Sequence, residues 1–244
     1  MSKGSLITED LLKNINYDMD CMKVDSTNQD NDRQRQPAVL ILFGHSDINA
    51  ALHHLVQSLE NPLDGKTFVA TVLVQESIKQ EFDDKLKSHL KPYSNSGLTK
   101  DAGYIKALDN VKKLNAQALT VPGGPIVVYD FTHEHLGGHA GFVTTLHTFR
   151  TAKEAIALVG KESLSFPNVS IWHENHAFAY ELVAGLKSNN FFINCYNMPL
   201  TLLENAAQSG KSFVAMEKNY HYETMPHNGV QKNIVFPIGS IFAN

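Results

Sequence analysis

Residues 168–197 read NVSIWHENHAFAYELVAGLKSNNFFINCYN and carry the clearest structural pattern in the chain. Residues 168–172 and 190–197 are short, bounded by polar residues and rich in β-branched and aromatic side chains, which is typical of strands. Residues 176–187, HAFAYELVAGLK, have the length and composition of a helix. A strand, a helix and a second strand in this order predict two parallel strands joined by a right-handed crossover.

The same alternation extends toward the N-terminus. Further strands are predicted at 38–43 (AVLILF), 67–75 (TFVATVLVQ), 125–131 (PIVVYDF) and 141–149 (GFVTTLHTF). A helix is predicted after Ser46 and Asp47, because the apolar residues Ile48, Ala51, Leu52, Leu55 and Leu59 recur at helical spacing. Other helices are predicted from Ser77 to just before Pro92, at 104–114 and at 151–161. This order predicts an α/β layered domain with a mostly parallel sheet flanked by helices.

Two parts of the chain differ in composition. Residues 24–36, VDSTNQDNDRQRQ, contain one Val as their only hydrophobe, and Leu6, Ile7, Leu11, Leu12 and Ile15 ahead of them follow a helical pattern. We therefore expect an N-terminal helix and flexible polar linker over 1–36, and the α/β domain over 37–244. After residue 197 the alternation weakens, with a helical turn at TLLENAAQ and a final strand at NIVFPI, residues 233–238, expected at a sheet edge.

Composition excludes several classes of function. The formal net charge of −4 over 244 residues provides no basic field for nucleic acid. No apolar run reaches the roughly 18 residues that a membrane span needs, and the N-terminus lacks the apolar core of a secretory signal. The two cysteines, Cys21 and Cys195, are too few and too far apart for a disulfide framework. We therefore expect a cytoplasmic protein.

Three blocks in order resemble the aldehyde dehydrogenase superfamily. PAVLILFGHSDINAALHHLVQSL is similar to the family block S-P-N-I-V-x-x-D-A-D-L-D-x-A, and TFVATVLVQESIKQEFDDKLKSHL to R-x-x-V-x-x-x-I-Y-D-E-F-x-x-K-L. Residues 168–197 resemble the block that ends in V-N-C-Y-N, with Asn194, Cys195, Tyr196 and Asn197 in the matching places. The resemblance covers only the catalytic-domain portion of that family. It implies the family's α/β scaffold, in which a sheet continues across the dimer interface.

The catalytic groups of that family are missing from the matching positions. Where the family has a nucleophilic Cys in G-Q-x-C, this chain has residues 64–68, DGKTF, so that Lys66 or Phe68 stands at the nucleophile. Where the family has a basic Glu in E-L-G-G, this chain has residues 31–36, NDRQRQ. Oxidation through a thiohemiacetal needs a thiolate. We therefore assign no catalytic residue and expect a degenerate member of the superfamily.

No G-x-G-x-x-G turn precedes the matched blocks. We therefore expect no resident cofactor, and NAD or NADP only if a partner chain supplies the dinucleotide-binding domain. One remnant is conceivable from the resemblance: Glu134 in HEHLGGH stands near the Glu of the family's E-x-F-G-P motif, which contacts the nicotinamide ribose.

The histidines and the second cysteine are other candidate sites of chemistry. His133, His135 and His139 with Glu134 form the densest group of metal-ligand types, but their spacing matches no strong zinc signature, so no metal ligand is assigned. His53, His54, His173 and His176 are expected at the surface or at helix caps. Cys195, at the end of an apolar segment, is expected to be a small buried hydrophobe.

The sequence therefore favours a pseudoenzyme that acts by binding or oligomerisation. It would form a homo-oligomer, or a hetero-oligomer with a complete aldehyde dehydrogenase, and would bind neither nucleic acid nor membrane. One alternative is an NAD(P)-dependent aldehyde oxidoreductase subunit that borrows its cofactor domain from a partner. A second is a metal-dependent enzyme that uses the His133–His139 loop.

Overall fold

A computed structural model describes residues 35–136 and 141–239, with the side chains of residues 207 and 208 left aside. The predicted N-terminal helix and most of the predicted linker, residues 1–34, lie outside the described residues. The domain described here begins with Arg35 and with a strand that starts at Gln36.

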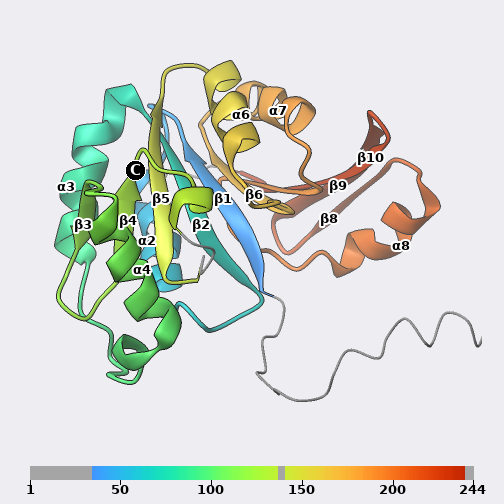
Figure 1. Cartoon of the computed structure of the whole chain (residues 1–244). Coiled ribbons are helices and arrows are strands. Elements are labelled where there is room, and N and C mark those ends of the chain that lie inside the picture. Colours follow the sequence, from blue (N-terminus) through green and yellow to red (C-terminus); the bar gives the residue numbers. More distant parts are fainter. Residues whose placement is uncertain (1–34, 137–140, 240–244) are drawn as a thin grey trace, which may run out of the picture. The chain divides into compact units, whose positions relative to one another are not determined.

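Ten strands form one sheet (Figure 1). They are β1 (Gln36–Leu42), β2 (Thr67–Gln75), β3 (Ala118–Thr120), β4 (Ile126–Tyr129), β5 (Val143–Phe149), β6 (Asn168–Trp172), β7 (Asn190–Ile193), β8 (Phe213–Glu217), β9 (Tyr220–His227) and β10 (Val230–Pro237). Their order is β3-β4-β5-β2-β1-β6-β7-β10-β9-β8. Six of the nine pairings between neighbours are parallel, which confirms the predicted α/β class with a mostly parallel sheet.

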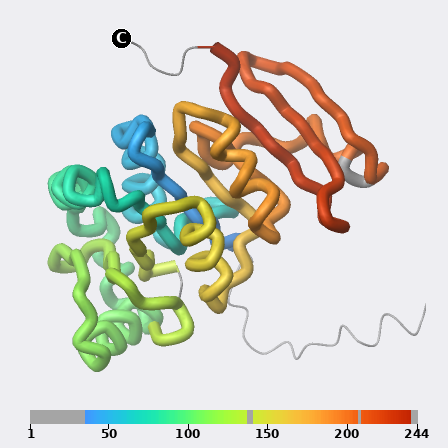
Figure 2. The backbone as a smooth tube through the Cα atoms, turned by 90° about the horizontal axis from the view of Figure 1, so that it is seen from above, coloured from blue at the N-terminus to red at the C-terminus, as the bar shows by residue number. Residues whose placement is uncertain are grey.

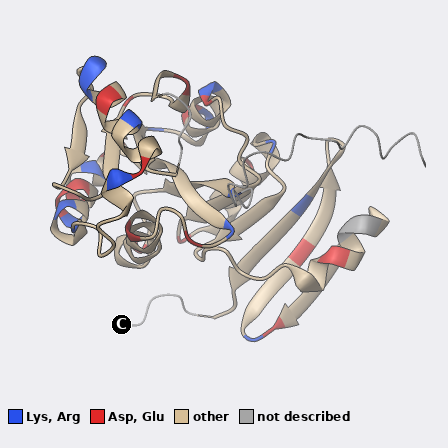
Figure 3. Ribbon diagram, turned by 60° about the horizontal axis from the view of Figure 1, so that its bottom comes forward, with Lys and Arg blue, Asp and Glu red and all other residues tan. Residues whose placement is uncertain are grey.

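Helices cover both faces of the parallel part. They are α2 (Ile48–Glu60), α3 (Lys79–His89), α4 (Ala102–Lys113), α5 (His133–Leu136), α6 (Ala152–Lys161), α7 (His176–Gly185) and α8 (Thr201–Ser209), with single 3₁₀ turns η2 (Glu76–Ile78) and η3 (Leu98–Lys100). Buried residues of α2 and α3 pack with one face of β1 and β2, and those of α6 and α7 with the other. Figure 3 shows charged residues mostly on the helices and loops around the sheet.

The first helix follows the predicted pattern closely. Asp47 caps α2 by accepting a hydrogen bond from the backbone N–H of Ala50 at 3.0 Å, which satisfies one of the free donors of the first turn. The five apolar residues named from the sequence are the buried residues of this helix. The next α-helix, α3, differs from the prediction, because Ser77 lies within η2 and α3 begins only at Lys79, without a side-chain cap.

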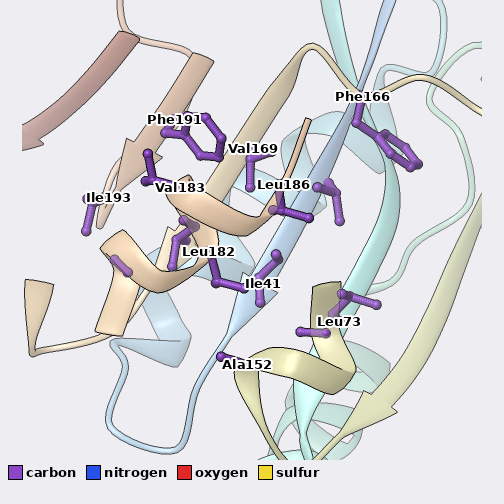
Figure 4. Close-up of a cluster of buried hydrophobic side chains, with 14 of the residues drawn as sticks. Ile41, Leu73, Ala152, Phe166, Val169, Leu182, Val183, Leu186, Phe191 and Ile193 are labelled. Carbon is purple, nitrogen blue, oxygen red and sulfur yellow. The ribbon is translucent and has the colours of Figure 1, made fainter. Parts of the chain in front are cut away.

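The core beneath α6 and α7 shows why the central strands are continuous apolar runs. Leu182 and Val183 from α7 and Ala152 from α6 pack against Ile41 of β1 and Val169 of β6 (Figure 4). Because the opposite face of β1 is covered by α2, the side chains of residues 38–42 of this strand are all buried. A strand buried on both faces cannot alternate apolar and polar residues.

The C-terminal strands correct one prediction. The segment NIVFPI lies in β10, which is an interior strand with β7 on one side and β9 on the other, not an edge. Seen from above in Figure 2, β8, β9 and β10 form the orange-to-red end of the chain. Two tight turns connect them, at Lys218–Asn219 and Asn228–Gly229, and all four residues have positive φ. Such turns match the strand twist and set the hairpin register, so the edge is β8.

Within the described ranges, no helix is both long and apolar enough to cross a membrane.

Candidate functional site

The two segments that resemble the nucleophile and base positions lie side by side. Strands β1 and β2 are parallel neighbours, with Gln36 opposite Thr67, so the residues just before each strand meet at one edge of the sheet. The backbone N–H of Gln36 donates to the carbonyl of Lys66 at 2.8 Å. A pocket of about 430 Å³ opens here, lined by Arg35, His54, Gln57, Ser58, Asn61, Asp64, Gly65, Thr67 and Tyr196.

Arg35 fastens the turn that stands in place of the nucleophile loop. Its guanidinium donates to the carbonyls of Pro62, Asp64 (2.7 Å) and Gly65 (3.3 Å). It also lies 4.7 Å from the centroid of the Phe68 ring, within the range of a cation–π contact. Lys66 is exposed and Phe68 is buried, so neither residue at the predicted nucleophile position presents a nucleophile to the pocket.

The remaining side chains of this pocket are held by packing. The ring of His54 stacks on Tyr196 with centroids 5.5 Å apart and lies 5.9 Å from the Trp172 ring. Burial, with a smaller contribution from His53, lowers the pKa of His54. Burial raises the pKa of the Tyr196 phenol to about 12, so it stays protonated at neutral pH. The hydroxyl of Ser58 accepts the backbone N–H of Val69 at 2.8 Å.

Cys195 is the buried residue that the sequence predicted. It is 5% exposed, its thiol lies 3.5 Å from the Val235 carbonyl, and burial raises its pKa well above the ordinary value. A thiol in this environment is a poor nucleophile. Cys21 lies outside the described residues.

The strand predicted at 190–197 ends earlier, at Ile193. The residues that follow it connect two strands of the sheet. Asn194 has a φ of 52°, and its side chain bonds the backbone of His173, accepting at 2.9 Å and donating at 2.8 Å. These bonds tie the end of β7 to the end of β6. His173 is itself 8% exposed, which corrects the expectation of a surface or cap residue.

The histidine loop is divided between the surface and the interior. Glu134 and His135 are exposed on α5, whereas His133 is 2% exposed, and His139 lies outside the described residues. Among residues 35–136 and 141–239, no group of three His, Cys, Asp or Glu side chains is placed to hold a metal ion.

His133 instead belongs to a buried polar cluster that the sequence did not predict. Its centre is Glu162, at the end of α6, whose side chain is fully buried. One carboxylate oxygen accepts the backbone N–H of His133 at 3.0 Å and lies 3.2 Å from its Nδ1. The other accepts the hydroxyls of Thr145 at 3.0 Å and Thr71 at 3.4 Å, and lies 3.4 Å from Nε2 of His147.

This cluster holds a buried carboxylate in its charged form. Burial alone would raise the pKa of Glu162, but the hydrogen bonds from His133 and the nearby His147 ring outweigh burial and hold that pKa well below its usual range. The cluster joins the end of α6 to β2, β5 and α5 at once. The signal available in the sequence was the set of polar residues, Thr71, Thr145 and His147, inside otherwise apolar strands.

Comparisons with known proteins give a family and a fold. A family model described as "Protein of unknown function (DUF1487)" matches residues 33–242. A search of curated proteins finds no match.

Several solved structures are similar in fold. An aldehyde dehydrogenase from Brucella melitensis biovar abortus 2308 is 18% identical, covering 66% of this chain and 38% of that one, with a TM-score of 0.53. Lactaldehyde dehydrogenase from Escherichia coli is 20% identical, with 68% and 40% covered and a TM-score of 0.51. Delta-pyrroline-5-carboxylate dehydrogenase from Mycobacterium tuberculosis is 11% identical, with 66% and 35% covered and a TM-score of 0.54.

The similar region thus spans about two fifths or less of those dehydrogenases. At this identity the likeness concerns the fold alone, and it agrees with the α/β architecture described above. By the match over 33–242, the chain belongs to the DUF1487 family, and its fold is similar to part of the aldehyde dehydrogenases.

Proposed function

We propose that this protein is a non-catalytic, aldehyde dehydrogenase-like protein that acts by binding, and that its first partner is a second copy of itself. The observation that carries the first half is Arg35, which fastens the turn at Pro62–Gly65 through three carbonyls. A guanidinium is permanently charged and cannot act as a general base at neutral pH. No cofactor is expected unless a partner supplies its domain.

The thiol chemistry of a dehydrogenase has no support at this edge of the sheet. Cys195 follows β7, its buried thiol faces the Val235 carbonyl and is not among the groups that line the pocket, and burial raises the pKa of this thiol. A partner chain could supply a nicotinamide-binding domain but not a nucleophile inside this pocket. We therefore favour binding over a borrowed oxidoreductase activity, and the free buried thiol fits a reducing compartment such as the cytoplasm.

The expected result is that the purified chain oxidises neither aliphatic nor aromatic aldehydes with NAD or NADP. Formation of the reduced nicotinamide at 340 nm is the measurement, at enzyme concentrations high enough to detect one turnover per hour. Turnover that disappears in Cys195→Ala, while the variant stays folded, would overturn the proposal.

Assembly is proposed through β8, because this strand is the outer edge of the sheet. Three apolar side chains lie bare on it: Phe213 is 40%, Val214 55% and Met216 71% exposed. If two copies pair antiparallel about Ala215, Val214 of one copy stands opposite Met216 of the other. The pairing would then extend the sheet and cover these side chains in both copies.

Sedimentation velocity at micromolar concentrations tests this interface. The wild-type chain should sediment as a dimer, and Val214→Lys should sediment as a monomer because it places a charge in the pairing edge. Ile105→Lys is the matched control, since Ile105 is also 55% exposed but lies on α4. A monomeric wild type, or a dimer that Val214→Lys leaves intact, would contradict assembly through β8.

A further inference from the structure

A second large cavity lies at the opposite end of strands β1 and β2 from the Arg35 pocket. Its volume is about 900 Å³, within the usual range for small-molecule sites. It is formed where β1, β2, β5 and β6 end, by Gly44 and His45, Gln75 and Ser77, Arg150 to Lys153, and His173. These four strands are parallel, so their carboxyl ends share this edge.

The topology creates a crevice at this edge. Strands β1 and β6 are neighbours, but the chain leaves β1 for α2 on one face and leaves β6 for α7 on the other. When the helices that follow two neighbouring strands lie on opposite faces of the sheet, neither helix covers the carboxyl ends of those strands. Open α/β sheets bind ligands in the crevice that this leaves.

The wall on the β6 side is aromatic and partly bare. Phe178, at the start of α7, is 51% exposed although it lines the cavity. Its ring stacks on His173 with centroids 5.0 Å apart and planes at 29°. Phe43 meets the same imidazole edge-on at 5.0 Å. A flat apolar group placed against Phe178 would cover a ring that the protein leaves exposed.

His173 supplies a donor without a partner. The side chain is 8% exposed, and its Nδ1 accepts the backbone N–H of Asn175 at 2.8 Å, which places the proton of the neutral ring on Nε2. No described residue accepts from Nε2. Nε2 is not fully enclosed by protein atoms, so it is open to the cavity.

The opposite wall is the N-terminus of α6, a helix of ten residues. The first-turn N–H of Glu154 donates to the Thr151 hydroxyl, but those of Ala152 and Lys153 find no acceptor among the described residues. Free N–H groups at a helix start favour an anion. The Lys153 ammonium adds a positive charge here, while Glu181, the acidic lining residue, lies across the cavity on α7.

The floor between the two walls is rigid. The Gln75 amide accepts the backbone N–H of Gly44 at 2.6 Å and donates to the Arg150 carbonyl at 3.2 Å, which ties β1, β2 and β5 together. A Cβ at Gly44 would lie 2.7 Å from the Ser77 hydroxyl and 3.1 Å from the Gln75 amide oxygen, so a side chain here would displace these polar groups. A preformed cavity with a few converging polar groups is the usual form of a small-molecule site.

We infer that this cavity binds a small aromatic anion, with its ring against Phe178 and His173 and its phosphate or carboxylate at the first turn of α6. The juxtaposition of a bare aromatic wall, an unpartnered imidazole donor and unpaired helix N–H groups defines that ligand class. The inference does not depend on the absence of aldehyde oxidation or on dimer formation.

The test uses the full chain and phenyl phosphate, with inorganic phosphate and benzyl alcohol as probes that lack the ring and the charge. Affinities come from amide shifts in two-dimensional NMR spectra, and the ring spectrum of His173 reports on Nε2. Phenyl phosphate should bind more tightly than either partial probe and should shift the amides of Ala152 and Lys153 and the Nε2 resonance.

Variants separate the two subsites. Phe178→Ala should weaken phenyl phosphate about fivefold by removing the ring contact, and Lys153→Gln about threefold by removing a charge beside the helix start. The matched controls are Ile105→Ala, with similar exposure on α4, and Lys161→Gln, at the other end of α6. All four side chains are exposed, and unfolding midpoints confirm that each variant is folded.

Three outcomes would overturn the inference. In the first, phenyl phosphate binds no more tightly than inorganic phosphate or benzyl alcohol. In the second, the shifts fall outside this cavity and leave His173 unchanged. In the third, Phe178→Ala and Lys153→Gln bind phenyl phosphate as tightly as their controls.

Discussion

Replacing Glu162 by Gln should destabilise the domain, and the loss should depend on pH. The carboxylate has two oxygens that accept from or face His133, Thr145, Thr71 and His147, and its side chain is fully buried. An amide keeps one acceptor oxygen and turns an NH₂ group toward donors. Because the variant leaves buried donors unpaired and removes a buried charge, its free energy of unfolding should be about 3 kcal/mol lower than that of wild type at pH 5.5.

The pH dependence has a definite sign. The pKa of Glu162 is lowered in the folded state from its ordinary value of 4.5, so its contribution is fully present above that value. As the pH falls below 4.5, Glu162 becomes protonated in the unfolded chain but stays ionised in the folded one, so its contribution to the free energy of unfolding is progressively lost. The difference in the free energy of unfolding between wild type and Glu162→Gln should therefore shrink by about 1.4 kcal/mol for each pH unit below the pKa of Glu162 in the unfolded chain.

Urea unfolding at pH 5.5 and pH 3.5, followed by circular dichroism, measures both quantities. Glu60→Gln is the control, because Glu60 is an exposed carboxylate at the end of α2 and should change stability by less than about 0.5 kcal/mol. A Glu162→Gln variant as stable as this control, or a gap that does not narrow at pH 3.5, would refute the account of a charged, satisfied carboxylate.

Two further changes test other parts of the structure. Deleting residues 1–34 should shift the thermal midpoint by only a few degrees, because residues 24–34 are mostly polar. Deleting residues 1–36 should lower the midpoint clearly further, because it also removes the Arg35 hydrogen bonds; equal midpoints for the two deletions would contradict the role given to Arg35. Lys232→Met should lower the free energy of unfolding, measured in urea, by about 2 kcal/mol, because the buried ammonium donates to the carbonyls of Leu186 (2.6 Å) and Ser188 (2.8 Å). Lys187→Met, at an exposed lysine, should lower it little, and equal losses in the two variants would rule out the contribution of the Lys232 hydrogen bonds.

The parallel part of the fold was predictable because its signals are local. The predicted strand at 67–75 coincides with β2, and the periodicity after Asp47 named the buried face of α2. Both follow from burial on two faces of a sheet, which requires apolar runs in the strands and an apolar stripe on the helix.

Of the C-terminal strands only β10 was predicted in part, and β9 was missed because it carries no apolar run. Residues 220–227, YHYETMPH, are mainly polar or half-buried, and their strand conformation comes from pairing with β10. The informative signal was the turn Asn228–Gly229, where both residues adopt positive φ. An Asn-Gly pair between two candidate strands is a strong hairpin signal, and it would have made β10 an interior strand.

The Glu162 cluster could not be predicted in the same way. Its members are at positions 71, 133, 145, 147 and 162, and only the folded sheet brings them together. A polar residue in an apolar strand indicates that a partner exists but does not identify it. The histidine loop, for the same reason, suggested a metal before the structure paired His133 with a carboxylate.

The two ends of the parallel sheet have opposite characters, and this contrast bears on function. At the amino-terminal end, Arg35 satisfies three turn carbonyls and covers Phe68, although the Tyr196 hydroxyl in the same pocket has no hydrogen-bond partner among the described residues. At the carboxyl-terminal end, the donors on His173 and at the start of α6 have no described acceptor, and Phe178 is half exposed. A ligand can bind unpaired donors beside an exposed ring without breaking any hydrogen bond of the fold. A ligand that binds beside Arg35 would first have to break the hydrogen bonds of its guanidinium. A small molecule is therefore expected at the carboxyl-terminal end, even though the resemblance to dehydrogenases directs attention to the other.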